Sequence, residues 1–113
     1  SHIINLEKLE PFSDFVYVFT PKGDIIELPR GSTALDFAYA IHEDIGNRCM
    51  GAMINKKIEK LSYKLNDGDK IEIKISNSKN NVNKDWLDIV KTRYARKCVR
   101  KAVRQKKDSD FVI

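Results

Sequence analysis

The side chains of this chain that could do chemistry are few and lie far apart in the sequence. There are two histidines, His2 and His42, and two cysteines, Cys49 and Cys98, without the Cys-x-x-Cys spacing typical of zinc and redox sites. No nucleophile with a nearby base, no metal-binding His-Asp set and no phosphate-binding loop of the GxxxxGK type is present. The sequence therefore predicts no catalytic residue, no metal and no cofactor, and it leaves His42 as a candidate for binding a ligand.

His42 lies at the edge of the apolar face of a predicted helix. A ring in that position can pack on a sheet and offer one nitrogen to a ribose hydroxyl. The alternative is a boundary histidine that is hydrogen-bonded to a nearby carbonyl. Cys49 begins an apolar run, so we expect a buried structural thiol, and two unpaired cysteines are typical of the reducing cytoplasm.

Basic residues form the second group with possible chemistry, because Lys and Arg bind phosphate backbones. Residues 1–78 carry ten Lys and Arg against twelve Asp and Glu, a net charge of −2, whereas residues 79–113 carry eleven against four, a net charge of +7. In the first part, the candidates for phosphate contact are Arg48, Lys56, Lys57, Lys60 and Lys64. For any single lysine, the favoured interpretation is a solvated residue on an edge strand, where its charge prevents the strand from pairing with another sheet. Arg48 is the favoured contact.

The elements that must position these residues begin with a hairpin. Residues 15–19 and 25–28 have strand composition, and the Pro-Lys-Gly-Asp sequence between them is typical of a tight turn. Thr33 is predicted to cap a helix that runs roughly from Thr33 to Ile45 and ends at a left-handed Gly46. Its apolar stripe consists of Ala34, Phe37, Ala38, Ile41 and Ile45.

Tyr39 lies off this stripe, where it would cover the helix flank in part or form a surface aromatic that stacks on a base. Further strands are predicted at residues 49–54, near Ile58 and at residues 71–75. Two hairpin strands, one crossing helix and a mixed sheet predict an α+β protein of the β-grasp, or ubiquitin-like, plan, with this single helix as the cover of the sheet.

The C-terminal third has a different pattern. Trp86, Val90, Tyr94, Cys98 and Ala102 recur every fourth residue among Lys and Arg, which predicts an amphipathic basic helix from about Asp85 to Arg104. The helix could lie along RNA or an acidic domain, or its charge could serve solubility alone. Its candidate contact residues are Arg93, Arg96, Lys97 and Arg100. The predicted organisation is an N-terminal extension (1–13), a β-grasp domain (14–77), a linker (78–85) and a basic helix with a frayed tail (86–113).

Several segments together resemble the TGS domain of long RelA/SpoT-type enzymes, which make and degrade (p)ppGpp. They are VFTPKGDIIELPRGSTALDFAYAIHEDIGNRC, GAMIN, LNDGDKIEI and DWLDIVKTRYARK, and the resemblance runs from about Phe15 to Lys97. The FTPKGD segment is also similar to TGS domains of threonyl-tRNA synthetases and some GTPases. The DFAYAIH segment followed by Arg-Cys, together with DWL, favours the RelA/SpoT type.

This resemblance implies a regulatory fragment of a cytoplasmic GTP pyrophosphokinase or (p)ppGpp hydrolase of the stringent response. Ribosome-associated members of the family contact the CCA 3′ end of uncharged tRNA, and the family residue at the position of His42 lies near the terminal ribose. An esterified amino acid would clash there. The implied RNA-binding residues are His42, Arg48, Lys56 and Lys57. Other members contact acyl carrier protein, and the parent's own catalytic domains are a further alternative partner; a membrane is not expected.

The chain also departs from the family pattern. Asn47 replaces a frequent second histidine, and Lys56-Lys57 replaces a common Gly-Arg pair in a tight turn. A residue suited to negative φ would then occupy a left-handed position, at a cost of about 1 kcal/mol.

Overall fold

The computed structural model describes residues 13–110, with side chains as far as residue 107. The predicted N-terminal extension, apart from Ser13, and the last three residues of the predicted tail lie outside the described residues. In chain order the elements are β1 (Phe15–Phe19), β2 (Ile25–Pro29), α1 (Ala34–Ile41), α2 (Glu43–Asn47), β3 (Cys49–Ile54), β4 (Lys57–Glu59), β5 (Ile71–Ile75), the 3₁₀ helix η2 (Lys84–Asp88) and α3 (Arg93–Asp110).

The strands form a hairpin and a three-stranded sheet that meet at one point. β1 pairs antiparallel with β2, and β3 lies between β4 and β5 with antiparallel pairing on both sides. A parallel bridge joins Phe19 to Lys70, and the Phe19 N–H donates to the carbonyl of Asp69 at 2.8 Å. The spatial order β2-β1-β5-β3-β4 is that of a mixed β-grasp sheet, so the predicted α+β fold is confirmed.

The predicted helix from Thr33 to Ile45 is in fact two helices. Thr33 caps α1 with the expected reciprocal bonds to Asp36, but α1 ends at Ile41 and α2 begins at Glu43. Between them His42 is extended, with φ −170° and ψ 146°, and its Nδ1 accepts the backbone N–H of Asp44 at 2.9 Å. The helix breaks here because the imidazole satisfies a free N–H at the start of a new helix.

Gly46 does not end the helix in a left-handed conformation, as its position in the sequence suggested. It is buried within α2, and a Cβ on it would lie 2.1 Å from a ring carbon of Tyr39. Tyr39 is itself 1% exposed, so the expectation of a surface or flanking aromatic is also wrong. Glycine is required here because the helix passes directly over the tyrosine ring.

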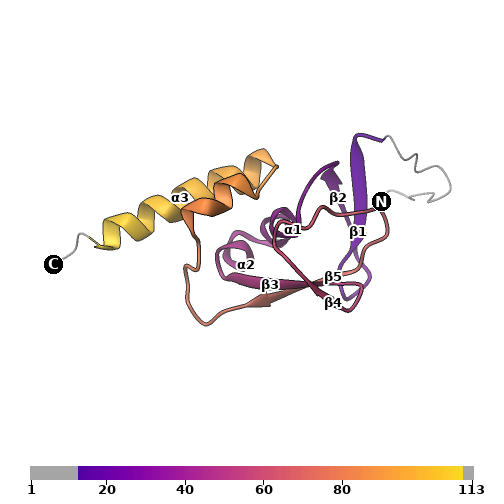
Figure 1. Cartoon of the computed structure of the whole chain (residues 1–113), viewed down its shortest axis with the longest axis horizontal. Helices are drawn as coiled ribbons and strands as arrows, with labels where there is room; N and C mark the ends of the chain where they lie inside the picture. The colour runs from indigo at the N-terminus through magenta and orange to yellow at the C-terminus, as the bar shows by residue number, and fades with distance from the viewer. Residues whose placement is uncertain (1–12, 111–113) are drawn as a thin grey trace.

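Helix α1 is buried on two faces, and each face belongs to a different core. One face contacts the hairpin and the sheet in what we call the sheet core: Val16, Val18, Leu28, Ala34, Phe37, Ala52, Ile54, Leu65 and Ile71. The other face contacts the C-terminal segment in what we call the docking core: Leu35, Ala38, Tyr39, Cys49, Val82, Trp86, Val90, Ala95, Cys98, Val99 and Ala102. The helices α1 and α2 therefore lie between the sheet and α3 (Figure 1).

The predicted continuous helix from Asp85 to Arg104 is also interrupted. The 3₁₀ helix η2 ends at Asp88 and α3 begins at Arg93, so the every-fourth-residue stripe does not form one face. Trp86 and Val90 reach the docking core, whereas Tyr94 is 50% exposed. The buried face of α3 consists instead of Ala95, Cys98, Val99 and Ala102.

The carboxylate of Asp36 explains where this second break occurs. It is 1% exposed and accepts the backbone N–H groups of Lys91 and Thr92 at 2.9–3.0 Å and the Thr92 hydroxyl at 3.1 Å. The Thr92 hydroxyl oxygen in turn accepts the N–H of Ala95 in the first turn of α3. A side chain that caps α1 thus also fixes the chain just before α3. The boundary at residue 77 remains a prediction, but the docking core crosses it.

Candidate functional site

His42 is exposed at the junction of α1 and α2, which we call the helix junction. Because Nδ1 accepts the Asp44 N–H, the hydrogen of the neutral ring lies on Nε2. The bond is to an N–H, whereas the alternative interpretation expected a carbonyl. The structure therefore holds the ring by one nitrogen and leaves Nε2 as a hydrogen-bond donor on the surface.

Two acidic residues follow His42, and each has a basic partner. Asp44 accepts from Arg48 at 3.4 Å, and Glu43 accepts from the ammonium of Lys101 on α3 at 3.3 Å. The Arg48 Nε also donates to the carbonyl of Ser76 at 3.0 Å. Arg48 is thus close to His42, but its side chain joins the end of β5 to α2, and only part of its guanidinium is left for a ligand.

Lys56 and Lys57 lie elsewhere: Lys56 is in the turn between β3 and β4, and Lys57 is the first residue of β4. Asn55 and Lys56 have φ of 51° and 71°, so the expected left-handed lysine is confirmed. The six residues of β3, roughly 20 Å of strand, separate this turn from Arg48. The structure therefore does not bring the four predicted RNA-binding residues together: His42 and Arg48 lie at one end of β3, and Lys56 and Lys57 at the other.

Helix α3 passes close to the helix junction. Lys101 contacts Glu43, the neighbour of His42, so the middle of α3 comes close to the junction. The predicted contact residues Arg93, Arg96, Lys97 and Arg100 are all exposed. Those four side chains have no acidic partner among the ion pairs of residues 13–107.

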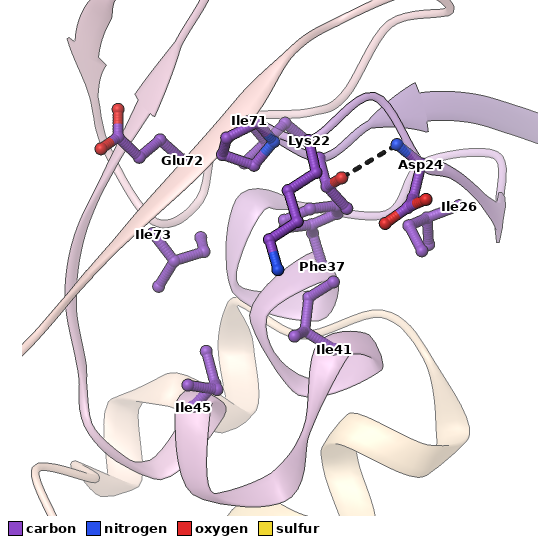
Figure 2. A pocket seen from close by; sticks show the side chains of 11 residues that line it. Lys22, Asp24, Ile26, Phe37, Ile41, Ile45, Ile71, Glu72 and Ile73 are labelled. Carbon is purple, nitrogen blue, oxygen red and sulfur yellow. Dashed lines mark hydrogen bonds between the residues drawn. The ribbon is translucent and has the colours of Figure 1, made fainter.

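An apolar hollow of about 460 Å³ borders the helix junction on the other side. It lies between the β1–β2 turn, the end of α1, α2 and β5, and its lining residues are Thr20, Pro21, Lys22, Asp24, Ile26, Phe37, Ile41, Ile45, Ile71, Glu72 and Ile73. Figure 2 shows the isoleucines turned into this space, with Lys22 extended across it and the Asp24 N–H bonded to Thr20. Such a hollow can accept an aliphatic or planar group.

Sequence reasoning missed the hollow because its walls come from separate segments. Ile41 and Ile45 were expected in the buried stripe of one helix, but Ile41 is 42% exposed and Ile45 is half-buried. The break at His42 turns α2 away from the direction of α1, so residues that would share a face of one helix line a depression instead. The apolar stripe in the sequence was that of one continuous helix, and it did not indicate the helix break or the hollow.

The two cysteines and Tyr39 are structural. Burial raises the pKa of the Cys49 thiol to about 11, and burial also raises the pKa of Cys98 and of Tyr39. The Tyr39 hydroxyl donates to Asn47 at 2.9 Å. The buried structural thiol expected at Cys49 is confirmed. Within the described residues, no group of three His, Cys, Asp or Glu is placed to hold a metal ion.

The model of the TGS domain family matches residues 16–75, which is more than half of the chain and includes β1 to β5. The chain belongs to the TGS domain family. Among residues 13–110, no helix is long and apolar enough to cross a membrane.

Relatives of this TGS domain are much longer proteins. A GTP pyrophosphokinase of Myxococcus xanthus is 50% identical over 98 residues, which are 87% of this chain and 13% of that protein. A GTP pyrophosphokinase of Escherichia coli K12 is 56% identical over 77 residues, 68% of this chain and 10% of the relative. A guanosine-3′,5′-bis(diphosphate) 3′-pyrophosphohydrolase of Aquifex aeolicus is 41% identical over 112 residues, 99% of this chain and 16% of that enzyme.

These names confirm the resemblance to RelA/SpoT-type proteins. The chain spans only about a tenth to a sixth of the length of these relatives. The match to the Aquifex protein covers nearly the whole chain, so it includes η2 and α3 as well as the residues of the family model.

Proposed function

We propose that this TGS domain senses the CCA 3′ end of uncharged tRNA, as a regulatory part of a longer cytoplasmic GTP pyrophosphokinase or (p)ppGpp hydrolase of the stringent response. The observation that carries the proposal is the surface Nε2 donor of His42, oriented by the bond between Nδ1 and the Asp44 N–H. That donor would bond an oxygen of the terminal ribose. An amino acid esterified to the ribose would occupy the same space and prevent the contact.

The surroundings of His42 support recognition of a nucleotide end. The apolar hollow offers a surface for a base beside the junction, and Arg48 and Lys101, which pair with Asp44 and Glu43, bring positive charge close to it for the backbone. A site that hydrogen-bonds a substrate hydroxyl discriminates strongly against an analogue that cannot make the bond. A capped, fixed imidazole suits this task because its position changes little when the ligand arrives.

The test is an NMR titration of the 113-residue chain with an acceptor-stem hairpin ending in CCA. One hairpin has a free 3′ hydroxyl, and the other has an amide-linked amino acid that does not hydrolyse. We expect the amide signals of His42, Glu43 and Asp44 to shift with the free hairpin and to respond much more weakly to the aminoacylated one. Equal responses to both hairpins, or none to either, would refute hydroxyl sensing.

His42→Asn is the matched variant. Asparagine caps helices well, so its side chain can still accept the Asp44 N–H, but it cannot present a donor at the position of Nε2. We therefore expect α2 to stay intact while the preference for the free hairpin disappears. A variant that keeps the preference would show that another group reads the hydroxyl.

A second candidate function is contact with an acidic protein, either acyl carrier protein or a catalytic domain of the parent. The observation in its favour is the exposed strand β4, where Ile58 is 85% exposed and directly follows Lys56 and Lys57. Shifts confined to β4 on addition of acyl carrier protein, with none at His42 on addition of RNA, would favour this candidate.

A further inference from the structure

The outward side of α3 carries a continuous row of basic residues. Arg93, Lys97, Arg100, Arg104 and Lys107 follow one another in steps of four and three residues, the spacing of one helix face. All five are exposed, and the row runs opposite to the buried Ala95, Val99 and Ala102. It extends over about 21 Å of helix. We call it the basic row.

The charges of the basic row are not neutralised within the described part of the protein. The ion pairs of residues 13–107 are Arg30–Asp67, Arg48–Asp44 and Lys101–Glu43, and none includes a member of the row. Of the three other basic residues of α3, Arg96 is exposed beside the row, whereas Lys101 bonds to Glu43 and Lys106 bonds to the carbonyl of Val82. The unpaired cations are therefore concentrated on the side that faces away from the domain.

The helix that carries the basic row is fixed in place. The Asp36 carboxylate holds residues 91 and 92 by their N–H groups, and four side chains of α3 are buried in the docking core. Figure 1 shows α3 continuing past α1 and α2, so its far end is open to a partner. A rigid row of charges loses little conformational entropy when it binds an extended polyanion.

We propose that the basic row binds the phosphate backbone of double-helical RNA. In the proposed function this duplex is the acceptor stem whose 3′ end reaches His42, and to that extent the inference rests on the proposed function. Lys101, which bonds to Glu43, lies one helical turn from Lys97 and Arg104 of the row, so a stem that follows the row passes close to the helix junction and its 3′ end can reach His42. The contact is independent of base sequence, because backbone phosphates carry no direct sequence information.

The composition of the row favours RNA over an acidic protein. Protein interfaces usually have an apolar or aromatic centre and are depleted in lysine. The row has no apolar member, and Tyr94, half-exposed, lies to one side. Phosphate backbones, by contrast, are bound mainly by Lys and Arg, with strong salt dependence.

The test uses fluorescence anisotropy with a blunt 12-base-pair RNA duplex that lacks any CCA end, at several KCl concentrations. The variant is Lys97→Gln, Arg100→Gln and Arg104→Gln in one chain. The matched control removes the same charge from exposed lysines outside α3, by Lys79→Gln, Lys84→Gln and Lys91→Gln. We expect the row variant to bind the duplex roughly 10- to 100-fold more weakly. The plot of the logarithm of the association constant against the logarithm of the KCl concentration should become less steep by about 2 to 3. The control should lose less than about threefold.

The other outcomes overturn the proposal. An equal loss of affinity for the duplex in the row variant and in the control would mean that the net positive charge of the protein alone attracts the RNA. Polyglutamate that competes with the duplex at equal charge concentration would indicate an acidic protein partner. If the row variant is less stable to urea, Arg93→Gln with Lys107→Gln replaces it, and unchanged duplex binding by that pair would equally refute the contact.

The proposed function fails in a different way. Because the duplex has no CCA end, its binding does not depend on His42. Intact binding of the duplex together with no discrimination by the 3′ terminus would reject hydroxyl sensing and leave the basic row as an RNA contact.

Discussion

The sheet core and the docking core share helix α1 but are assembled differently. The sheet core is built from residues 16–71, within the range that the TGS family model matches. The docking core takes four residues from that range and seven from residues 82–102. The sheet core resembles the core of a self-contained domain. The docking core exists only because a later segment of the chain returns to cover the other face of α1. The helix that ends at His42 is thus held from both sides.

This difference has a consequence for the site. His42, Glu43 and Asp44 follow directly on a helix that contacts both cores, and Lys101 of α3 bonds to Glu43. A change in the docking of α3 would therefore displace Glu43, which is the neighbour of the His42 ring that presents Nε2.

Deletion of residues 78–113 should have the largest effect. It uncovers Leu35, Ala38 and Tyr39, each at most 1% exposed in the full chain. We expect a loss of at least about 3 kcal/mol in the free energy of unfolding, enough to leave a small domain partly unfolded. Circular dichroism with urea measures it, and deletion of 108–113 alone is the control. If residues 1–77 unfold at the same urea concentration as the full chain, the docking core contributes nothing to stability.

Asp36→Asn should lower the free energy of unfolding by about 2 to 3 kcal/mol. The amide NH₂ would face N–H donors, and the negative charge that now accepts their hydrogen bonds would be lost. The readout is Trp86, the single tryptophan, which is 7% exposed in the docking core. We expect its fluorescence transition to move to lower urea, whereas Asp88→Asn, at an exposed position of η2, should leave the transition unchanged. A change below about 0.5 kcal/mol would mean that the carboxylate is not a main support of the docked segment.

Gly46→Ala should cost about 1 to 3 kcal/mol, since the added Cβ overlaps the ring of Tyr39 and α2 must shift. Gly51→Ala is the control, because a Cβ there meets no atom within 4 Å. Urea unfolding of both variants measures the difference. Equal stability of the two would contradict the close contact between α2 and the tyrosine ring.

Lys56→Gly should produce the smallest change, a gain of about 0.5 to 1 kcal/mol from relief of the left-handed φ. Lys57→Gly, in strand β4, should be neutral or destabilising. The gain should add to the loss caused by Asp36→Asn, because the two sites lie in different parts of the structure. Non-additive stabilities in the double variant would show that the two cores are coupled through the sheet.

Local patterns were enough to predict most of the sheet core. The hairpin at residues 15–28, the cap at Thr33 and the strand at 71–75 each depend on turn chemistry or on alternation within a few residues, and the family resemblance followed from the same segments. The left-handed Lys56 was predicted from the family resemblance, because Lys56-Lys57 replaces a common Gly-Arg pair.

The docking core could not be predicted in this way. The partners of Asp36 lie 55 and 56 residues later, and nothing in the local sequence marks them. The sequence did contain one indication of a second buried face on α1. Leu35 and Tyr39 lie outside the main apolar stripe, and such residues indicate a helix that is buried on more than one side. The candidate site was predicted as far as the identity of His42, but its capping bond, the hollow and the separation of Lys56 from Arg48 required the structure.

The ratio of two dissociation constants tests the central claim most directly. The ligands are the CCA-ended acceptor stem with a free 3′ hydroxyl and its amide-linked aminoacyl form, each measured with the unsubstituted chain and with His42→Asn. The account predicts that the unsubstituted chain prefers the free end by about 10-fold or more, and that the ratio falls to about one in His42→Asn. The same ratio in both proteins would contradict it.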